Sequence, residues 1–308
     1  MKHYKILALK YRPQDFKNLI GQEVLSKTIT NAIKIGKTPN AYLLTGIRGV
    51  GKTTTARLIA KALNCVNNDS QKNICDPNNL CDSCSAITNS SHIDVLEMDA
   101  ASKTGIDDIR DLIENSKYSP TSAKFKIFII DEVHMLSKQA FNGLLKTLEE
   151  PPPSLKFILA TTEVKKIPIT ILSRCQRFDL KRVSIEKIVK HLEEISKKEK
   201  GNISAKALRI IAQVSEGSVR DGISLLDRAI TFQNVNSKNE VDDHDIRNML
   251  GLADKSKIIN LLKEVFSGNS SAAIDILKDL FSQGIEAKYF LNDILEILNL
   301  INRKISCF

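Results

Sequence analysis

The chain lacks the features of a secreted or membrane protein. Its 308 residues contain no run of 18 apolar residues, which excludes an ordinary membrane-spanning helix. The first ten residues are too short and too interrupted by lysine to form a signal peptide. The six cysteines do not have the spacing of a secreted disulfide framework, because four of them lie within twenty residues of one another. We therefore expect a cytoplasmic protein with no membrane attachment.

The charge of the chain is basic but diffuse. Lysine and arginine number 45 against 36 acidic residues, and the net charge of +9 is spread along the sequence. This charge would suit a polyanionic partner such as DNA. An organism whose proteins are generally rich in lysine would equally give such a net charge. Hydrophobic residues make up 42% of the chain, which is ordinary for a globular protein. The length suits about two or three domains, and there is no internal repeat or low-complexity tract.

The most informative motif is a glycine-rich loop at residues 46–53. Its sequence, Gly-Ile-Arg-Gly-Val-Gly-Lys-Thr, fits the phosphate-binding P-loop pattern G-x-x-x-x-G-K-[ST]. A short apolar run precedes the loop and a helical pattern follows it, so loop N–H groups and the helix N-terminus can converge on a phosphate. We expect Lys52 to reach the β- and γ-phosphates and the Thr53 hydroxyl to bind Mg²⁺. The alternative, a glycine-rich turn with an exposed lysine, does not explain the flanking elements.

The first 180 residues alternate apolar strands with helical patterns. The strands are rich in Ile, Leu, Val and Phe, which is typical of strands covered on both faces. This alternation predicts an α/β fold with a parallel sheet. The expected strands are residues 41–46, 93–99, 126–132 and 156–162, and the expected helices are residues 53–64, 105–117 and 138–149.

Acidic residues end one of these strands in the pattern of a Walker B motif. Asp131 and Glu132 follow an apolar run. We expect Asp131 to hold the coordination shell of Mg²⁺ and Glu132 to polarise the attacking water. Thr162 ends the following strand at the same edge of the sheet, where it can bond that water or the γ-phosphate. His134 is interpreted as structural rather than catalytic.

Two arginines are candidates for contact with the transferred phosphoryl group. Arg174 has no acidic partner close in sequence, and Arg220 lies in the helical region after the α/β part. A planar guanidinium suits the charge that develops on a γ-phosphoryl group. A surface ion pair is the alternative role for Arg174.

Beyond residue 180 the strand pattern disappears. A polar link at residues 234–240 separates a small helical bundle from later amphipathic helices. We therefore expect three domains, at residues 1–180, 181–248 and 249–308. The expected helices are residues 184–200, 204–215, 218–233, 243–250, 255–266, 271–281 and 287–302.

Four cysteines, Cys65, Cys75, Cys81 and Cys84, lie in a polar insert at about residues 65–90. Cys81 and Cys84 have the spacing of a chelating pair, and two further thiols make a tetrahedral four-cysteine site possible. Zn²⁺ would fold an Asn-, Asp- and Ser-rich segment that has little core of its own. Its role would be structural, because four thiolates leave no open position. Reduced thiols without metal are the alternative.

Together these motifs resemble AAA+ clamp-loader ATPases, specifically the gamma/tau subunits of bacterial DNA polymerase III. The resemblance covers essentially the whole chain and implies an AAA+ P-loop sheet with a zinc-binding insert, a helical lid and an all-α collar. Residues 11–16 and 20–23 match the opening segment of that family. The other matching segments are the P-loop and residues 131–134, 144–152, 160–162, 173–175 and 217–221.

The resemblance also implies roles for individual residues. Thr162 would be sensor 1 and Arg220 would be sensor 2, which reports the γ-phosphate to the lid. Arg174 would be an arginine finger that acts in trans, on ATP bound by a neighbouring subunit. The opening segment would frame adenine and ribose. The residues expected to bind ATP are Tyr11, Arg12, Gly46, Ile47, Arg48, Gly49, Val50, Gly51, Lys52, Thr53 and Thr54.

Contacts with DNA are implied near Lys103 and Lys166, although either lysine could be a solvated surface residue. The implied function is the ATPase motor of the replicative clamp loader, which loads the sliding clamp onto primed DNA. The implied partners are other clamp-loader subunits in a hetero-oligomeric ring, the sliding clamp, primer-template DNA and, through the holoenzyme, the polymerase core. Family labels often state DNA polymerase activity, but no polymerase site is expected in this chain.

Two other functions are possible for such a sequence. A non-hydrolysing scaffold subunit of the same complex would lack Lys52, Thr53 or Glu132, and all three are present. A different AAA+ machine, such as a branch-migration helicase motor, would carry a winged-helix domain after the lid, where amphipathic helices are expected instead.

The chain departs from the family in two places. Five residues separate Cys75 from Cys81, where the family usually has two. The collar of the family usually runs well beyond residue 308, so we expect residues 249–308 to be a partial collar of a fragment, a truncated product or a short form.

Overall fold

The computed structural model of the chain describes residues 6–67, 74–102, 105–235, 239–252, 255–282, 285 and 287–305. The chain divides into two compact units. Met1–Lys190 with Ser215–Ser224 form the first, and His191–Val214 with Leu225–Phe308 form the second. The first unit contains the sheet and all the nucleotide motifs.

The first unit is built on a parallel five-stranded sheet with strand order β2-β3-β4-β1-β5. Four strands confirm the sequence prediction to within two residues at each end. The fifth, β5, was not predicted, because it is an edge strand with only one buried residue and therefore has no apolar run. The strands are β1 (Ala41–Thr45), β2 (Val95–Asp99), β3 (Lys126–Asp131), β4 (Leu155–Thr161) and β5 (Gln176–Asp179).

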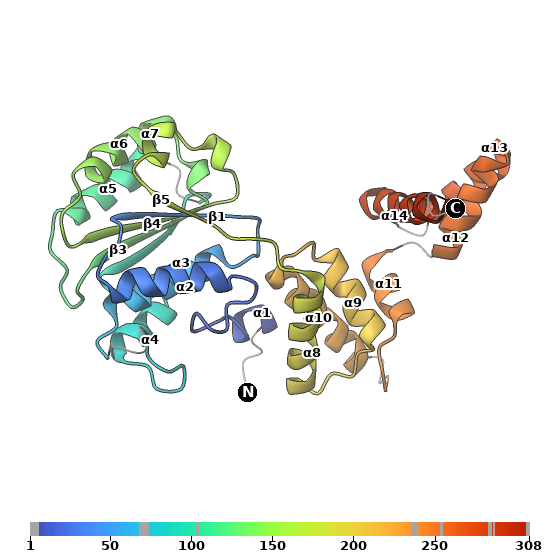
Figure 1. Cartoon of the computed structure of the whole chain (residues 1–308), viewed down its shortest axis with the longest axis horizontal. Helices are drawn as coiled ribbons and strands as arrows, with labels where there is room; N and C mark the ends of the chain where they lie inside the picture. Colours follow the sequence, from blue (N-terminus) through green and yellow to red (C-terminus); the bar gives the residue numbers. More distant parts are fainter. Residues whose placement is uncertain are drawn as a thin grey trace. The chain divides into compact units, whose positions relative to one another are not determined.

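Helices cover both faces of the sheet (Figure 1). Alternate residues of the central strands, among them Leu43, Phe128 and Phe157, pack in one core with α5, α6 and α7. The residues between them, such as Tyr42 and Ile129, point to the opposite face, where α2 and α3 lie. Burial on both faces explains why these strands have no polar alternation. These helices are α2 (Glu23–Lys34), α3 (Lys52–Asn64), α5 (Ile106–Ser116), α6 (Lys138–Glu149) and α7 (Ile169–Leu172).

The strand register brings the functional segments to one edge. Thr45 at the end of β1 pairs with Thr161 at the end of β4, and Asp99 at the end of β2 pairs with Asp131 at the end of β3. Because the strands are parallel, all four end at the same edge, where ligands bind in open α/β sheets. The P-loop, the acidic pair and Thr162 therefore leave the sheet side by side.

Short helices were harder to predict from the sequence than long ones. Helix α6 confirms its predicted bounds, since Ser137 accepts a hydrogen bond from the N–H of Ala140 at its start and prolines follow its end. No helix was predicted for α1, α2, α4 or α7, and three of these have only four to seven residues. The remaining short elements are α1 (Leu7–Lys10), α4 (Asp82–Thr88) and the 3₁₀ turns η1 (Val133–Met135) and η2 (Val164–Lys166).

In the part that the structure describes, the named elements of the second unit are all helices, and one isolated parallel bridge joins Ile203 to Val241. Helix α11 begins with a capping box at Asp242 and ends at Gly251, which has a left-handed backbone, and this explains why its predicted bounds are confirmed. Ile258, Leu280 and Phe290 belong to the core of its last three helices. No helix among the described residues is long and apolar enough to cross a membrane. The helices from residue 185 onward are α8 (Ile185–Lys198), α9 (Ala205–Val214), α10 (Val219–Val235), α11 (Asp243–Leu250), α12 (Lys255–Phe266), α13 (Ser270–Ser282) and α14 (Ala287–Ile305).

Candidate functional site

The glycine-rich loop connects β1 to α3 and has a backbone that requires its glycines. Gly49 has a φ of +75°, and a Cβ there would lie 2.0 Å from Ser218 Oγ. Gly51 has a φ of +108° and caps the N-terminus of α3. A side chain at either position would be strained or would clash. Val50 is buried while Arg48 is exposed, so the loop lies against the protein with its basic side chain in solvent.

Lys52 is the buried cation of the site. Its side chain is only 5% exposed, and its Nζ donates to the carbonyls of Gly46 and Ile47 at 3.1 Å each. Glu132 Oε1 lies 3.7 Å from the same nitrogen. Burial lowers the pKa of Lys52, and the nearby charges of Glu132 and Asp131 act in the opposite direction. The amine is therefore held between the loop and the acidic pair, where a phosphate could accept its hydrogen bonds.

The acidic pair contacts the loop and the neighbouring strand. The Thr53 hydroxyl donates to Asp131 Oδ2. Glu132 Oε2 accepts from the Thr162 N–H at 3.1 Å and from its hydroxyl at 3.0 Å. Glu132 has left-handed backbone angles, φ 45° and ψ 44°, which cost about 1–3 kcal/mol in a non-glycine residue. Such strain is typical of functional sites and orients the Glu132 carboxylate toward Thr162.

His134 has a closer relation to the acidic pair than the sequence indicated. Its Nδ1 lies 3.0 Å from the hydroxyl of the buried Thr161 and 3.5 Å from Glu132 Oε2. Its Nε2 lies 3.5 Å from Glu163 Oε1. The ring therefore bridges the end of β4 to Glu132, the candidate water-polarising group.

The opening segment of the chain also contacts the P-loop helix. Arg12 Nε donates to Thr54 Oγ1 at 3.0 Å. Burial, followed by repulsion from Arg57, lowers the pKa of Arg12. Tyr11 ends α1, and the ammonium of Lys10 lies 5.6 Å from the centre of its ring. Arg12 is thus placed at the first turn of α3, beside the residues that follow the loop.

Arg220 lies against the loop through its backbone. Its N–H donates to the Gly49 carbonyl at 3.2 Å, next to the close approach of Ser218 to Gly49. The charges of Arg220 and Asp131 both act on Arg12, so these side chains share one region of the first unit. The start of α10 therefore approaches the loop closely, and the Arg220 side chain is exposed there.

The guanidinium of Arg174 forms an ion pair with Glu149 at the end of α6. Its Nη2 donates to Glu149 Oε1 at 2.5 Å, and its Nη1 donates to the Thr170 carbonyl at 2.6 Å and to Ser173 Oγ at 3.3 Å. The Arg174 side chain is about one-third exposed, at 32%. The sequence prediction missed Glu149 as its partner, because 25 residues separate the two.

The prediction of DNA contacts at Lys166 and Lys103 stays a prediction. Lys166 is exposed and forms a 2.9 Å ion pair with Glu163. Lys103 lies outside the described residues.

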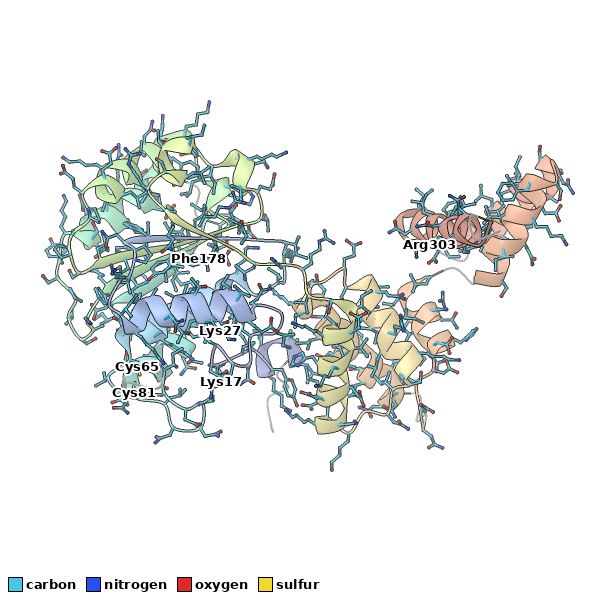
Figure 2. All side chains as sticks on the ribbon, viewed as in Figure 1. Lys17, Lys27, Cys65, Cys81, Phe178 and Arg303 are labelled. Carbon is cyan, nitrogen blue, oxygen red and sulfur yellow. The ribbon has the colours of Figure 1, made fainter. Side chains whose placement is uncertain are left out.

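The four cysteines meet in one cluster at the C-terminal end of α3. Their sulfur atoms all lie within 4.8 Å of one another, and the Cys65 and Cys75 sulfurs are 3.3 Å apart. Figure 2 shows Cys65 beside Cys81. The longer spacing between Cys75 and Cys81 therefore does not prevent the cluster from forming.

The environment of the thiols differs from one cysteine to the next. Burial raises the pKa of Cys65 to about 11. Burial also acts to raise the pKa of Cys81, but hydrogen bonds from the backbone N–H groups of Cys84 and Val66 outweigh it and lower that pKa to about 6. Cys84 is completely buried. The cluster is a mostly buried set of soft donors with one readily ionised member.

The fold is that of the AAA+ class. A Thermotoga maritima RuvB structure described as a Holliday junction branch migration motor has a TM-score of 0.58 and 20% sequence identity, and the match covers 92% of this chain and 90% of that chain. At this identity the likeness extends to the fold alone. The parallel sheet, the P-loop and the acidic strand end define an AAA+ P-loop protein with a four-cysteine insert and helical regions after it.

The particular family follows from sequence comparison. The model described as DNA polymerase III, delta subunit, matches residues 21–184, the clamp loader subunit ATPase lid domain matches residues 187–235, and domain III of subunits gamma and tau matches residues 241–305. The gamma subunit of Buchnera aphidicola subsp. Schizaphis graminum is 43% identical, with 96% of this chain and 80% of the relative covered. The chain belongs to the gamma/tau family of DNA polymerase III clamp-loader subunits.

Other relatives are longer than this chain. The gamma/tau subunit of Mycoplasma genitalium is 45% identical over 96% of this chain, and the Escherichia coli tau subunit is 41% identical over 97%. The match covers 48% and 45% of those proteins. The chain thus spans about half the length of these relatives.

Proposed function

We propose that this chain is an ATPase motor subunit of a bacterial clamp loader. The observation that carries the proposal is the contact between the loop and the acidic strand ends. Thr53 bonds Asp131, Lys52 lies 3.7 Å from Glu132, and Glu132 bonds Thr162. A scaffold subunit that only binds nucleotide would not need Glu132 beside Thr162.

Each of these side chains has a task in ATP hydrolysis. The loop N–H groups and the N-terminus of α3 bind the phosphates, and Lys52 exchanges its carbonyl partners for β- and γ-phosphate oxygens. Thr53 and Asp131 supply hydroxyl and carboxylate oxygens, which are the ligands that Mg²⁺ prefers, and the bound ion would offset charge on the phosphates. Glu132 orients and polarises the attacking water, and Thr162 senses the γ-phosphate as sensor 1.

Two arginines and the opening segment complete the proposed site. Arg220, as sensor 2, senses the phosphate from the start of α10, whose backbone contacts Gly49. Arg174 acts in trans on the ATP of a neighbouring subunit, which is consistent with its ion pair with Glu149 of its own chain. Tyr11 and Arg12 line the adenine and ribose side.

The cysteine cluster is proposed to hold a structural zinc ion. Four thiolates at about 2.3 Å from a tetrahedral ion would lie ~3.8 Å apart, close to the sulfur separations here. Cys65 ends α3 and Cys81 caps the start of α4, so a bound ion would fix the two helices to each other. The four thiolates would fill all four positions of the tetrahedral ion, so none would stay open for water and the ion would not take part in hydrolysis.

The remaining parts of the proposal concern assembly. We assign residues 1–180 to the ATPase domain, 181–248 to the lid and 249–308 to a collar that recruits other subunits. The proposed partners are a ring of clamp-loader subunits, the sliding clamp, primer-template DNA and the polymerase core through the holoenzyme. Polymerase activity would belong to that core, and the proposed location is the cytoplasm.

The test is an ATP hydrolysis assay with the chain alone and with partner subunits, sliding clamp and primed DNA. We expect slow turnover alone and strong stimulation by the complete set, since Arg174 can complete only a neighbouring site. Rapid turnover by a purified monomer would contradict the trans role of Arg174. Absence of nucleotide binding would contradict the whole proposal.

A further inference from the structure

The side chain of Gln14 joins three segments of the first unit. Its Oε1 accepts from Lys61 Nζ at 2.8 Å and lies 3.4 Å from the Thr88 hydroxyl, and its Nε2 donates to the Arg12 carbonyl at 3.2 Å. Lys61 belongs to α3 and is 2% exposed, while Thr88 is the last residue of α4. The cavity between these residues is about 20 Å³, room for about one water molecule. This contact is therefore a joint between segments and not a ligand pocket.

One side of the joint leads to the nucleotide site. Gln14 holds the carbonyl of Arg12, and the Arg12 guanidinium donates to Thr54 Oγ1 at 3.0 Å. Thr54 follows Thr53, whose hydroxyl bonds Asp131. A shift of Gln14 would move Arg12 against the first turn of α3.

The other side leads to the cysteine cluster. The Thr88 hydroxyl donates to the Cys84 carbonyl at 2.8 Å, one turn earlier on α4, and shares its single hydrogen with Gln14. Cys84 contributes its sulfur to the cluster, and Cys81 caps the same short helix. A metal that fixes the sulfur of Cys84 in this seven-residue helix and that of Cys81 just before it would also fix Thr88.

We propose that Gln14 is a positioning residue that couples metal occupancy of the cysteine cluster to nucleotide affinity. This inference rests on the proposed zinc and ATP sites. With the metal bound, α4 holds Thr88 in place beside Gln14, Lys61 of α3 bonds the same Gln14 oxygen, and Gln14 in turn holds Arg12 beside Thr54. Without the metal, α4 loses its anchor and the opening segment is held by fewer contacts. The coupling is reciprocal, so bound nucleotide must raise the affinity of the cluster for the metal by the same factor.

The experiment measures affinity for a fluorescent adenine nucleotide with Mg²⁺ on the full chain, before and after zinc is removed by a chelator. In the wild type we expect zinc removal to weaken binding about 5- to 10-fold, the effect of one or two hydrogen bonds. In Gln14→Ala, affinity should already be reduced, and zinc removal should change it less than about twofold. In Thr88→Val the coupling should also fall, whereas Thr88→Ser, which keeps the hydroxyl, should retain it.

Gln139→Ala is the matched control. Gln139 is also a glutamine of the first unit, but it lies exposed on α6, which covers the opposite face of the sheet from α3. This variant should keep the wild-type ratio of affinities. Metal analysis of every variant before chelation checks that each one starts with zinc, and circular dichroism checks that the helices remain after chelation.

A second measurement uses the same linkage in reverse. Saturating nucleotide should tighten zinc binding about 5- to 10-fold in the wild type, measured by equilibrium competition with a coloured chelator, and should not tighten it in Thr88→Val. Equal effects of zinc removal in the wild type, Gln14→Ala and Thr88→Val would overturn the inference while leaving both proposed sites intact. Absence of zinc or of nucleotide binding in the wild type would overturn the proposed function and this inference together.

Discussion

Replacing Glu132 by glutamine tests the proposed hydrolytic role with little disturbance of the structure. Glutamine has the same length and keeps one carbonyl oxygen, which can still accept from the N–H and hydroxyl of Thr162 at 3.1 and 3.0 Å. The change removes the negative charge that lies 3.7 Å from Lys52 Nζ. It also removes the basic oxygen that would polarise the attacking water.

The expected magnitude follows from these contacts. A positioned base contributes about 10²- to 10⁴-fold to a rate, which is about 3–5 kcal/mol of transition-state free energy. Nucleotide affinity should not fall, because Lys52 loses a competing partner and becomes more available to phosphate. Glu132→Gln should therefore lower turnover at least about 100-fold while nucleotide binding stays equal or tightens.

The assay is steady-state ATP hydrolysis by the assembled loader with clamp and primed DNA, paired with a nucleotide-binding titration. Glu163→Gln is the matched control, since this acid is 49% exposed and contacts His134 and Lys166 but neither Lys52 nor Thr162 in the contacts described above. Retention of more than about a tenth of wild-type turnover by Glu132→Gln would refute the role of Glu132. An equal loss in Glu163→Gln would show that a general change in charge explains the effect.

Three further predictions concern other parts of the first unit. Arg174→Ala should lower hydrolysis by the assembled complex about 10³-fold and leave the nucleotide affinity of the isolated chain unchanged. Strong turnover by the isolated chain that this substitution does not change would contradict the role of Arg174 in trans. Metal analysis should find about one zinc ion per wild-type chain and little in Cys81→Ser; equal contents would contradict a four-thiolate site. Asp94 is 1% exposed, and although burial acts to raise its pKa, hydrogen bonds from three backbone N–H groups hold that pKa below the ordinary value of an aspartate. Asp94→Asn should therefore lower the free energy of unfolding in urea by about 2 kcal/mol at pH 7, and this difference should shrink as the pH falls through the folded pKa of Asp94. A difference that stays constant down to pH ~2 would exclude a charge effect.

The sequence predicts those strands and helices whose position depends on their own residues, through an apolar run or a capping side chain. Strands β1, β3 and β4 are continuous apolar runs because helices cover both of their faces, and this pattern is visible without the structure. Helices α6 and α11 have their predicted bounds because a capping side chain begins each of them. Strand β5 was not predicted, because most of its residues are exposed and it has no apolar run. Its place in the sheet depends on pairing with β1, which its own sequence does not indicate.

Some residues of the candidate site could likewise be identified from local motifs, whereas several of its contacts could not. Lys52 and Asp131 lie in motifs whose spacing is set by one loop and one strand end, so the sequence identifies them directly. The pairing of Arg174 with Glu149 and of Gln14 with Lys61 joins residues 25 and 47 positions apart. Such contacts depend on how helices pack on the sheet, and no local pattern in the sequence specifies them.

The contacts of the site also bear on the expected slow turnover of the isolated chain. Lys52 bonds loop carbonyls, Thr53 bonds Asp131, and Glu132 bonds Thr162, so every one of these groups has a protein partner. A phosphate offers replacement partners to Lys52, and we expect that exchange to be nearly neutral because one set of hydrogen bonds replaces another. The transferred γ-phosphoryl group gains no charge from Arg174 of its own chain, since that guanidinium is bound to Glu149 and is proposed to act on a neighbouring subunit. We therefore expect nucleotide binding to be a property of one chain and rapid hydrolysis to require the assembly.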